Sequence, residues 1–333
     1  MDYLMIEVRN KELYKLQFDQ FSRQYNVFQI VRSVYKTKKL RLLDVGGHLG
    51  KTHEFFQDDE VIVSDLYDLK QKNYVKASGL DLPFSDGEFD VVLSFDVFEH
   101  IAAKDRKKFV SELCRVSKDL VIIAAPFNTQ LVATTEKQVN ELYKKLYKKD
   151  QVWLAEHIDN GLPEMDLLIS HAETNKLDYR FYASNNLHLW KMIMSFHFLC
   201  GDSRLPQLSE DLDQFYNENM NSLGDTLEPT YRKICVLSKK DLGSELPDFS
   251  SKFDEKIYNE FIDKTFTSLA ELLKDKRLSI EELLNKKDLS YQNELGTQAA
   301  EIKQLKHELS DIKNSRAWKL ASKLSKAKNR ISK

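Results

Sequence analysis

Cysteine and long apolar runs are scarce in this sequence. Its three cysteines, Cys114, Cys200 and Cys235, lie far apart with no metal-binding or redox spacing, which excludes a small secreted scaffold held by disulfides. The longest uncharged apolar run, from Leu120 to Phe127, is much shorter than the ~20 residues that a membrane-spanning helix needs. The N-terminal stretch is charged where a signal peptide would be apolar. We therefore expect a cytoplasmic protein.

An excess of charge of one sign is also lacking. The 333 residues include 50 Lys or Arg and 52 Asp or Glu, for a formal net charge of −2, so we expect no nucleic-acid partner. Hydrophobic residues make up 42% of the chain, enough for a sizeable core, which excludes disorder over most of the length. This length predicts one large domain with an appendage, or two domains.

Glycine and proline are few and unevenly distributed. Five of the ten glycines lie between Gly46 and Gly87, only Gly296 follows Gly243, and all six prolines lie in the first 247 residues. Because these residues mark turns, a globular part should precede a helical one. The predicted parts are a domain over 1–240 with N-terminal helices and substrate-covering insertions over 128–230, a helical region over 250–290, and a coiled coil with a basic helix over 291–333.

Short apolar runs alternate with amphipathic stretches in the globular part. Helical spacing over 11–36 precedes the first run, and a charged amphipathic helix is predicted over 101–116. Residues 128–200 should be mostly helical and 201–230 an acidic loop. The predicted strands are 40–45, 61–64, 89–95, 120–125, 178–183 and 234–238. This alternation predicts an α/β fold with a mostly parallel sheet and helices on both faces.

The first predicted strand ends in DVGGHLG, from Asp44 to Gly50. In an α/β sheet, ligands bind at the carboxyl ends of the strands, near the point where strand order reverses. Glycines there let backbone amides approach a ligand. The second strand ends at Asp65, where a carboxylate can accept hydrogen bonds from both hydroxyls of a ribose. The pattern indicates a nucleoside-containing cofactor and fits NAD as well as S-adenosylmethionine.

The wider pattern distinguishes these two cofactors. The segments LLDVGGHLG, VIVSDLYD, LDLPFSDGEFDVVLSFDVFEHI and LVIIAAPF follow one another between Leu40 and Phe127. Together they resemble the class I S-adenosylmethionine-dependent methyltransferases, in the branch with an LPF-x-DGxFD segment and an EH dipeptide. The resemblance extends more weakly over residues 20–240. It implies a Rossmann-like fold, methyltransferase activity and S-adenosylmethionine as cofactor.

The resemblance also implies which residues bind the cofactor. Asp65 would bind the ribose, and Asp44 would lie near the methionine end. This chain departs from the family at His48, where glycine is usual, and at Ser78, where an aspartate often contacts the adenine amino group. These departures leave open a degenerate, non-catalytic copy of the fold that acts as a scaffold through its coiled coil. The implied set is Asp44, Gly46, Gly47, His48, Gly50, Asp65, Leu66, Ser78, Gly79, Leu80, Ser94, Phe95 and Asp96.

Histidines supply the candidate catalytic bases. Methyl transfer needs the acceptor atom in line with the methyl group and water excluded, and a general base helps a hydroxyl acceptor. The candidates are His100, in the EH dipeptide, and His157, in AEHIDNGLP together with Asp159. Alternatively, His100 packs at the start of the next helix with Glu99 structural, and His157 lies in a polar loop. No cluster of His, Asp or Glu has metal-ligand spacing, so we expect no metal.

The chain after residue 250 is predicted to be helical. Residues 250–290 have the pattern of two helices, with Ser279 and Glu282 as a capping box that opens the second. Residues 295–313 fit heptads, and their flanking charges attract across a parallel pair of helices. We therefore predict a parallel homodimer through 295–313; the alternative is a single amphipathic helix that lies on the domain. The core positions are Leu295, Gln298, Ile302, Leu305, Leu309 and Ile312, and the attracting pairs are Glu301 with Lys306 and Glu308 with Lys313.

The last segment, 312–333, contains eight Lys or Arg and no acid. A basic amphipathic helix with Trp318 predicts contact with an anionic membrane surface; the alternative is a frayed, solvated end of the coiled coil. The sequence NSRAWKLASKL resembles the S-x-(S/A)-W-(R/K)-L ending of bacterial surface-polysaccharide enzymes. This implies a cytoplasmic enzyme at the inner face of the plasma membrane, close to a glycosyltransferase partner.

The two resemblances together indicate an acceptor. We expect O-methylation of a sugar in a bacterial cell-surface polysaccharide or its lipid-linked precursor. A small metabolite or a lipid is the alternative acceptor.

Overall fold

The computed structural model describes residues 6–314, apart from residues 37, 48–49, 69, 71, 202–204, 222–224 and 244–253. The chain divides into two units, Met1–Leu272 and Leu273–Lys333. The first unit contains the sheet, and the described part of the second is the outer portion of a long helix.

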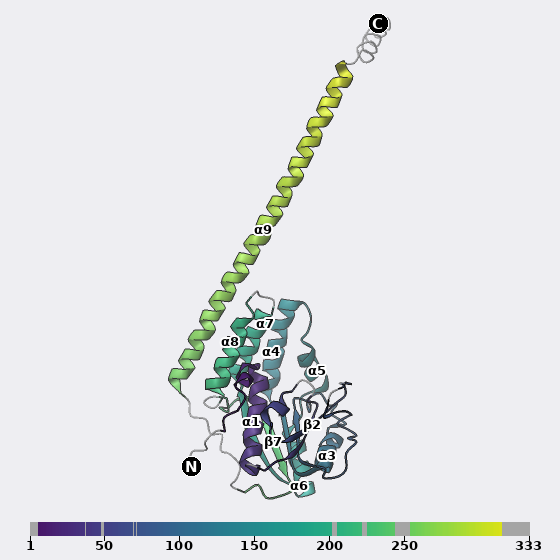
Figure 1. Ribbon diagram of the computed structural model, residues 1–333, viewed down its shortest axis with the longest axis vertical. Coiled ribbons are helices and arrows are strands. Elements are labelled where there is room, and N and C mark those ends of the chain that lie inside the picture. Colours follow the sequence, from purple (N-terminus) through teal and green to yellow (C-terminus); the bar gives the residue numbers. More distant parts are fainter. Residues whose placement is uncertain are drawn as a thin grey trace. The chain divides into compact units, whose positions relative to one another are not determined.

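A seven-stranded sheet forms the centre of the first unit, in the order β3-β2-β1-β4-β5-β7-β6 (Figure 1). All neighbouring strands are parallel except β7, which runs antiparallel to both β5 and β6. This confirms the expected α/β, Rossmann-like fold. The strand order reverses between β1 and β4, so the carboxyl ends of these strands form the edge where a ligand is expected. The strands are β1 (Arg41–Val45), β2 (Glu60–Asp65), β3 (Tyr74–Lys76), β4 (Phe89–Phe95), β5 (Ser117–Pro126), β6 (Asp178–Asn186) and β7 (Thr230–Ser238).

Helices bury both faces of the sheet. Leu42 of β1 belongs to one buried cluster with Ile30 of α1, whereas its neighbour Leu43 belongs to another with Phe109 of α3. Because both faces are covered, the strands have continuous apolar sequences rather than alternating ones. The helices up to residue 215 are α1 (Phe18–Tyr35), α2 (Thr52–Phe55), α3 (Arg106–Val116), α4 (Gln130–Tyr147), α5 (Val152–Asn160), α6 (Met165–Asn175), α7 (Leu187–Cys200) and α8 (Gln207–Phe215).

A third buried cluster lies mostly among helices that run side by side (Figure 1) and reaches the sheet at Tyr231 of β7. It contains Trp190 of α7, Leu212 of α8 and Phe261 of α9 (Glu255–Asn314). The ring centroid of Phe261 lies 5.9 Å from that of Tyr216. The beginning of α9 therefore belongs to the core of the first unit.

Residues 201–230 are not the acidic loop that we expected. α8 is followed directly by a π-helix, Tyr216–Met220. Leu208, Leu212, Tyr216 and Met220 recur every four residues and are all buried, which is a helical stripe. The acidic residues between them make the local composition resemble that of a loop, so the stripe was not recognised.

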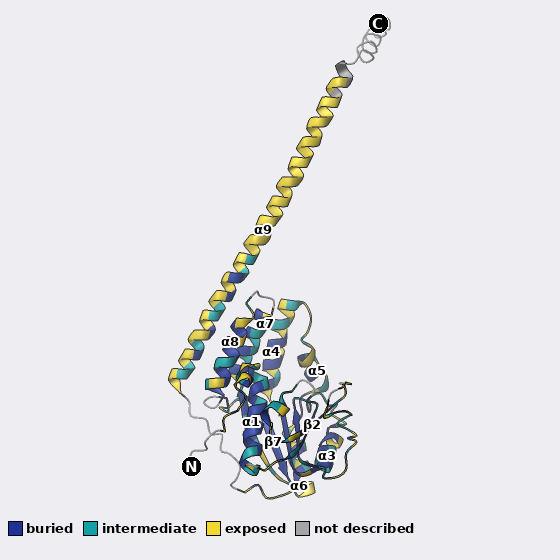
Figure 2. Cartoon of the chain, viewed as in Figure 1, coloured by how far each residue is buried: buried dark blue, intermediate teal, exposed yellow. Residues whose placement is uncertain are grey.

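α9 is one continuous helix, where two were expected. The hydroxyl of Ser279 donates to the carbonyl oxygen of Asp275 at 3.0 Å inside the helix and opens no second one. Beyond Leu272 the helix is exposed almost throughout (Figure 2), including the heptad positions Ile302 and Leu305. The basic segment after Asn314, with its polysaccharide-enzyme motif, lies outside the described residues, as do the side chains of Leu309 and Ile312. Among the described helices, none has the length and apolarity needed to cross a membrane.

Candidate active site

A tight glycine turn follows β1. Gly46 has a φ angle of +85°, and a Cβ there would overlap the side chain of Val97. A Cβ at Gly47 would overlap the carboxylate of Asp44. Both positions therefore require glycine, for backbone conformation or for close approach. His48, where the family usually has glycine, lies outside the described residues.

Asp44 lies in β1 and is fully buried. Its Oδ2 accepts a hydrogen bond from the hydroxyl of Thr52 at 2.5 Å, whereas its Oδ1 has no partner among the described residues. Burial raises the pKa of this carboxyl to about 6, against the opposing effects of Thr52 and Arg23. A Cβ at Gly50 would lie 3.4 Å from Oδ2. The turn thus surrounds a buried carboxylate, one oxygen of which has no hydrogen-bond partner among the described residues.

Asp65 ends β2, the neighbour of β1. Its Oδ1 accepts a hydrogen bond from the amide of Tyr67 at 3.3 Å, and the side chains of Leu66 and Tyr67 are exposed. The hydroxyls of Ser64 in β2 and Ser94 in β4 are buried without a partner among the described residues. The edge thus offers an acid, unpartnered hydroxyls and exposed apolar surface.

The loop at Ser78 has a structural explanation of its own. The Ser78 hydroxyl accepts a hydrogen bond from the amide of Leu80 at 3.2 Å, which holds the turn. A Cβ at Gly79 would overlap the ring of Phe109 in α3. Leu80 packs against the buried cluster that contains Phe109. Packing alone therefore accounts for the glycine at position 79.

Asp96 directly follows Phe95, the buried last residue of β4, and is paired with two arginines. Arg232 of β7 donates to both of its oxygens, at 2.7 and 2.6 Å, and Arg23 of α1 also donates to it. Burial alone would raise the pKa of Asp96, but the two guanidinium groups outweigh it and hold this pKa below its usual range. The arginines lie 73 and 136 residues away in sequence, so sequence spacing gave no sign of them.

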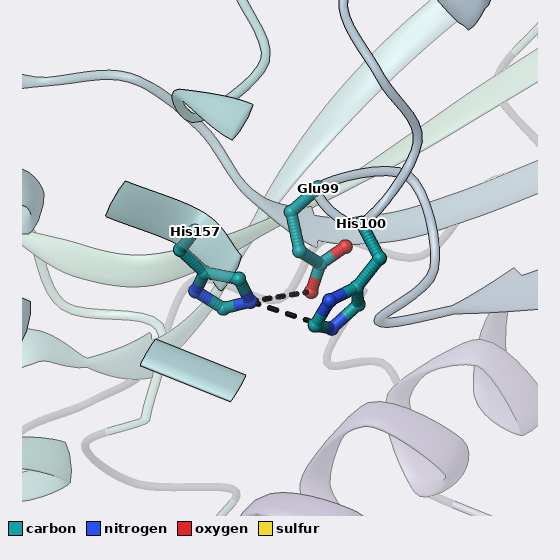
Figure 3. A group of neighbouring side chains, drawn as sticks. All are labelled: Glu99, His100 and His157. Carbon is teal, nitrogen blue, oxygen red and sulfur yellow. Dashed lines mark hydrogen bonds and ion pairs between the residues drawn. The ribbon is translucent and has the colours of Figure 1, made fainter. Parts of the chain in front are cut away.

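Glu99, His100 and His157 meet beside this pair (Figure 3). One potential ligand atom from each lies within 4.8 Å of the others. The Nε2 atom of His157 is 3.4 Å from Nε2 of His100 and 3.9 Å from Oε1 of Glu99. The structure thus brings together the two histidines that we selected as separate candidates.

Carboxylates hold both imidazole rings by their Nδ1 atoms. Glu136 of α4 accepts from Nδ1 of His157 at 2.8 Å and from the hydroxyl of Tyr231 at 2.8 Å. Glu156 of α5 accepts from Nδ1 of His100 at 2.7 Å. Because a carboxylate only accepts, the Nδ1 atoms carry the protons. The two Nε2 atoms face each other, and that of His157 also faces Glu99.

Burial and neighbouring charges shift the pKa values in this cluster. Burial alone would lower the pKa of His157, but its hydrogen bond to Glu136 and the charge of Glu99 raise it above the usual value. Burial and the charge of His157 lower the pKa of His100, despite Glu156. Burial and the charge of Asp96 raise the pKa of Glu99 to about 8.

The structure differs from the alternative interpretations of His100 and His157. α3 begins at Arg106 after Asp105, so His100 does not lie at the start of that helix. His157 lies in helix α5 rather than in a loop, and Asp159 of the same helix is exposed, outside the cluster. Glu136, Glu156 and Tyr231 were not predicted, because no local motif marks them.

Known proteins similar to this chain are methyltransferases or resemble them in fold. Residues 55–124 match a family model described as a methyltransferase domain. Similar solved structures include an S-adenosylmethionine-dependent methyltransferase from Archaeoglobus fulgidus (17% identity, 69% of this chain and 95% of that chain, TM-score 0.41) and the YcgJ protein from Bacillus subtilis (15%, 65% and 99%, 0.39). A third is the plantazolicin methyltransferase BpumL in complex with a triazolic analog and SAH (12%, 70% and 89%, 0.44). The family match supports a methyltransferase enzyme with S-adenosylmethionine as its cofactor.

The residues at the carboxyl edge fit that cofactor. Gly46 and Gly47 place backbone without side chains at the turn, and Oδ1 of Asp44, which has no partner among the described residues, can accept from a cationic amino group. Asp65 can accept from ribose hydroxyls. When bound, S-adenosylmethionine supplies a methyl group activated by its sulfonium.

Proposed function

We propose that this chain methylates a hydroxyl of a sugar, in a bacterial cell-surface polysaccharide or its lipid-linked precursor. The observation that carries the proposal is the pair of histidines at the carboxyl edge, each held at Nδ1 by a carboxylate. A hydroxyl is a weak nucleophile until it loses its proton, and an imidazole nitrogen is suited to accept that proton. The pair therefore favours an acceptor that must be deprotonated.

His100 is the better placed base of the two. Its side chain is 23% exposed, whereas that of His157 is 5% exposed. Its lowered pKa keeps the ring neutral near pH 7, so Nε2 can take a proton. His157 is then a positioning residue, fixed by Glu136 and Tyr231, whose Nε2 faces that of His100.

Two features support a sugar as the acceptor. Trp153 of α5 is 53% exposed and its ring centroid lies 6.1 Å from that of His100. Together with the exposed Val152 it places apolar surface beside His100, which suits the C–H face of a sugar ring. The resemblance of the tail to surface-polysaccharide enzymes points to the same class.

The test is methyl transfer by the full-length protein to a panel of acceptors. We expect label from S-adenosylmethionine in an O-methyl ether of a glycan sugar, and His100→Gln should lower kcat by roughly 10²–10⁴-fold. The affinity for S-adenosylhomocysteine should remain unchanged, and His188→Gln, at an exposed position, is the matched control. Label confined to phenols or fatty acids would instead support a small metabolite or lipid acceptor. Absence of S-adenosylhomocysteine binding would support the scaffold.

We also propose that the outer part of α9 forms a parallel homodimer through residues 295–313. Its exposed Leu295, Ile302 and Leu305 need a partner surface, and a second copy supplies the complementary charges. Truncation after Lys286 should leave a folded, cofactor-binding monomer by light scattering. A truncated protein that is still dimeric would refute the coiled coil. Binding of the full chain, but not the truncated one, to anionic vesicles would support a membrane contact by 312–333.

A further inference from the structure

We propose that Glu99, His100 and His157 bind a divalent transition-metal ion. The three residues come from two separate elements, the turn after β4 and helix α5, yet their side chains point toward one another (Figure 3). Two imidazole nitrogens and one carboxylate are donors that zinc, manganese, cobalt or ferrous iron accepts.

The spacing of the nitrogen atoms fits such an ion. Bonds of ~2.0–2.1 Å to two imidazoles in a tetrahedral site place the nitrogens about 3.4 Å apart. The Nε2 atoms of His100 and His157 are 3.4 Å apart. Oε1 of Glu99 lies 3.9 Å from Nε2 of His157, so a rotation of the carboxylate would complete three ligands on one side of an ion.

The polarity of the cluster suits a cation. With both Nδ1 protons donated to Glu136 and Glu156, the two Nε2 lone pairs face each other, and that of His157 also faces Glu99. The side chain of Glu99 is 1% exposed, and its Oε2 has no hydrogen-bond partner among the described residues. Acceptors that lack donors are costly to bury. A metal ion would satisfy the two Nε2 atoms and the carboxylate of Glu99.

The surroundings orient the ligands as metal sites do. Metal-binding histidines usually donate their other ring N–H to a carboxylate or carbonyl, which fixes the ring. His157 has Glu136 in this place, itself held by Tyr231, and His100 has Glu156. The nearby Arg106 of α3 donates to the backbone carbonyls of the turn and of Gly161 rather than to the Glu99 carboxylate.

The ion would have a defined task at this site, and this part rests on the proposed function. Three protein ligands leave coordination positions open. Adjacent oxygens of a sugar can occupy them, and the ion then lowers the pKa of a bound hydroxyl, so that its proton leaves to water. His100 would act as a ligand rather than as the base. The acceptor class is thus a sugar with two neighbouring oxygens.

Metal titration of the chelator-treated, full-length protein tests the site without any acceptor. Cobalt(II) absorbance and zinc(II) calorimetry should show one saturable site, and His100→Ala or Glu99→Gln should weaken it by roughly tenfold or more. His188→Ala is the matched control. His307→Ala controls for the exposed His307–Asp311 pair on α9. Unchanged affinity for S-adenosylhomocysteine shows that each variant is folded, and the partly exposed His100 keeps the test usable if Glu99→Gln fails to fold.

Each outcome separates the metal site from the proposed function. Absence of saturable binding up to about 1 mM metal, or binding that all cluster variants retain, would overturn the site and favour a shared proton between the imidazoles. Full methyl transfer to a sugar after chelation would overturn the task of the ion while the proposed function stands. Saturable binding that the cluster variants lose supports the site, even if no sugar is methylated and the proposed function fails.

Discussion

Asp96, which is partly buried, and Glu99, which is fully buried, are carboxylates three residues apart, and their surroundings are opposite. Asp96 faces two guanidinium groups, which lower its pKa. Glu99 faces two imidazoles, keeps one oxygen without a partner among the described residues, and has a raised pKa. A charge removed from solvent and fully paired holds elements together, whereas one that is incompletely paired is a candidate for chemistry. One short turn thus contains an anchor, Asp96, beside a reactive group, Glu99.

The largest effect should follow from breaking the anchor. Asp96→Asn would leave the buried Arg232 and the partly buried Arg23 without their counter-charge. Removing one partner of a buried pair costs about 3–5 kcal/mol, so the free energy of unfolding in urea should fall by that amount. Asp159→Asn, at an exposed position of α5, is the control. A cost no larger than that of the control would remove the distinction between the two carboxylates.

Asp44 is an intermediate case, with one neutral partner. Its pKa is raised from 3.8 to about 6 in the folded state. The folded protein therefore holds this proton more tightly than the unfolded chain, and the resulting stability is present below pH 4 and lost as the pH rises through 6. The loss is about 3 kcal/mol at most. Urea unfolding without cofactor should show it in the wild type and not in Asp44→Asn; parallel pH profiles would contradict this.

Asp65 is more accessible than the fully buried Asp44 and should matter for binding rather than for stability. Asp65→Ala should weaken the affinity for S-adenosylhomocysteine by more than tenfold, about 1.4 kcal/mol or more, because the ribose hydroxyls lose their acceptor. Calorimetric titration measures it. Asp68→Ala, three residues later on the same loop, is the matched control. Unchanged affinity would remove Asp65 from the site.

Glu99 should show the smallest effect on stability. Glu99→Gln keeps the shape of the side chain and disrupts no hydrogen bond of Oε2, which has no partner among the described residues. In the metal-free protein the free energy of unfolding should change by less than about 1 kcal/mol. A loss as large as that of Asp96→Asn would make Glu99 a second anchor.

Most strands were predictable because a strand that is buried on both faces of the sheet has a continuous apolar sequence. The run over 89–95 coincides with β4, and the other predicted runs fall on β1, β2, β5, β6 and β7 with shifted ends. β3 was missed because its three residues lie at the edge of the sheet and none is fully buried. α8 was missed because the local charge outweighs its narrow apolar stripe.

The candidate site was predictable only where it is local. The glycine turn and Asp65, the acid that ends β2, follow from one short stretch of chain, and both lie at the expected edge. His100 and His157 were selected as separate candidates. Their proximity depends on where α5 packs, and the hydrophobic periodicity of the sequence does not indicate that position. Spacing rules for metal sites detect ligands that are close in sequence, and 57 residues separate these two histidines. Glu136 and Tyr231 could not be selected, because neither belongs to a recognisable sequence motif.

The position of β7 between β5 and β6 sets an order of events during synthesis. β5 lacks its outer neighbour until the ribosome has made residues 230–238, after the whole stretch from Phe127 to Pro229. Until then β5 is an open edge, and β6 has no strand to pair with. The high contact order of this pairing predicts slow completion of the sheet. A nascent chain arrested before β7 should therefore be a preferred substrate for chaperones, whereas one released after Ser238 should not.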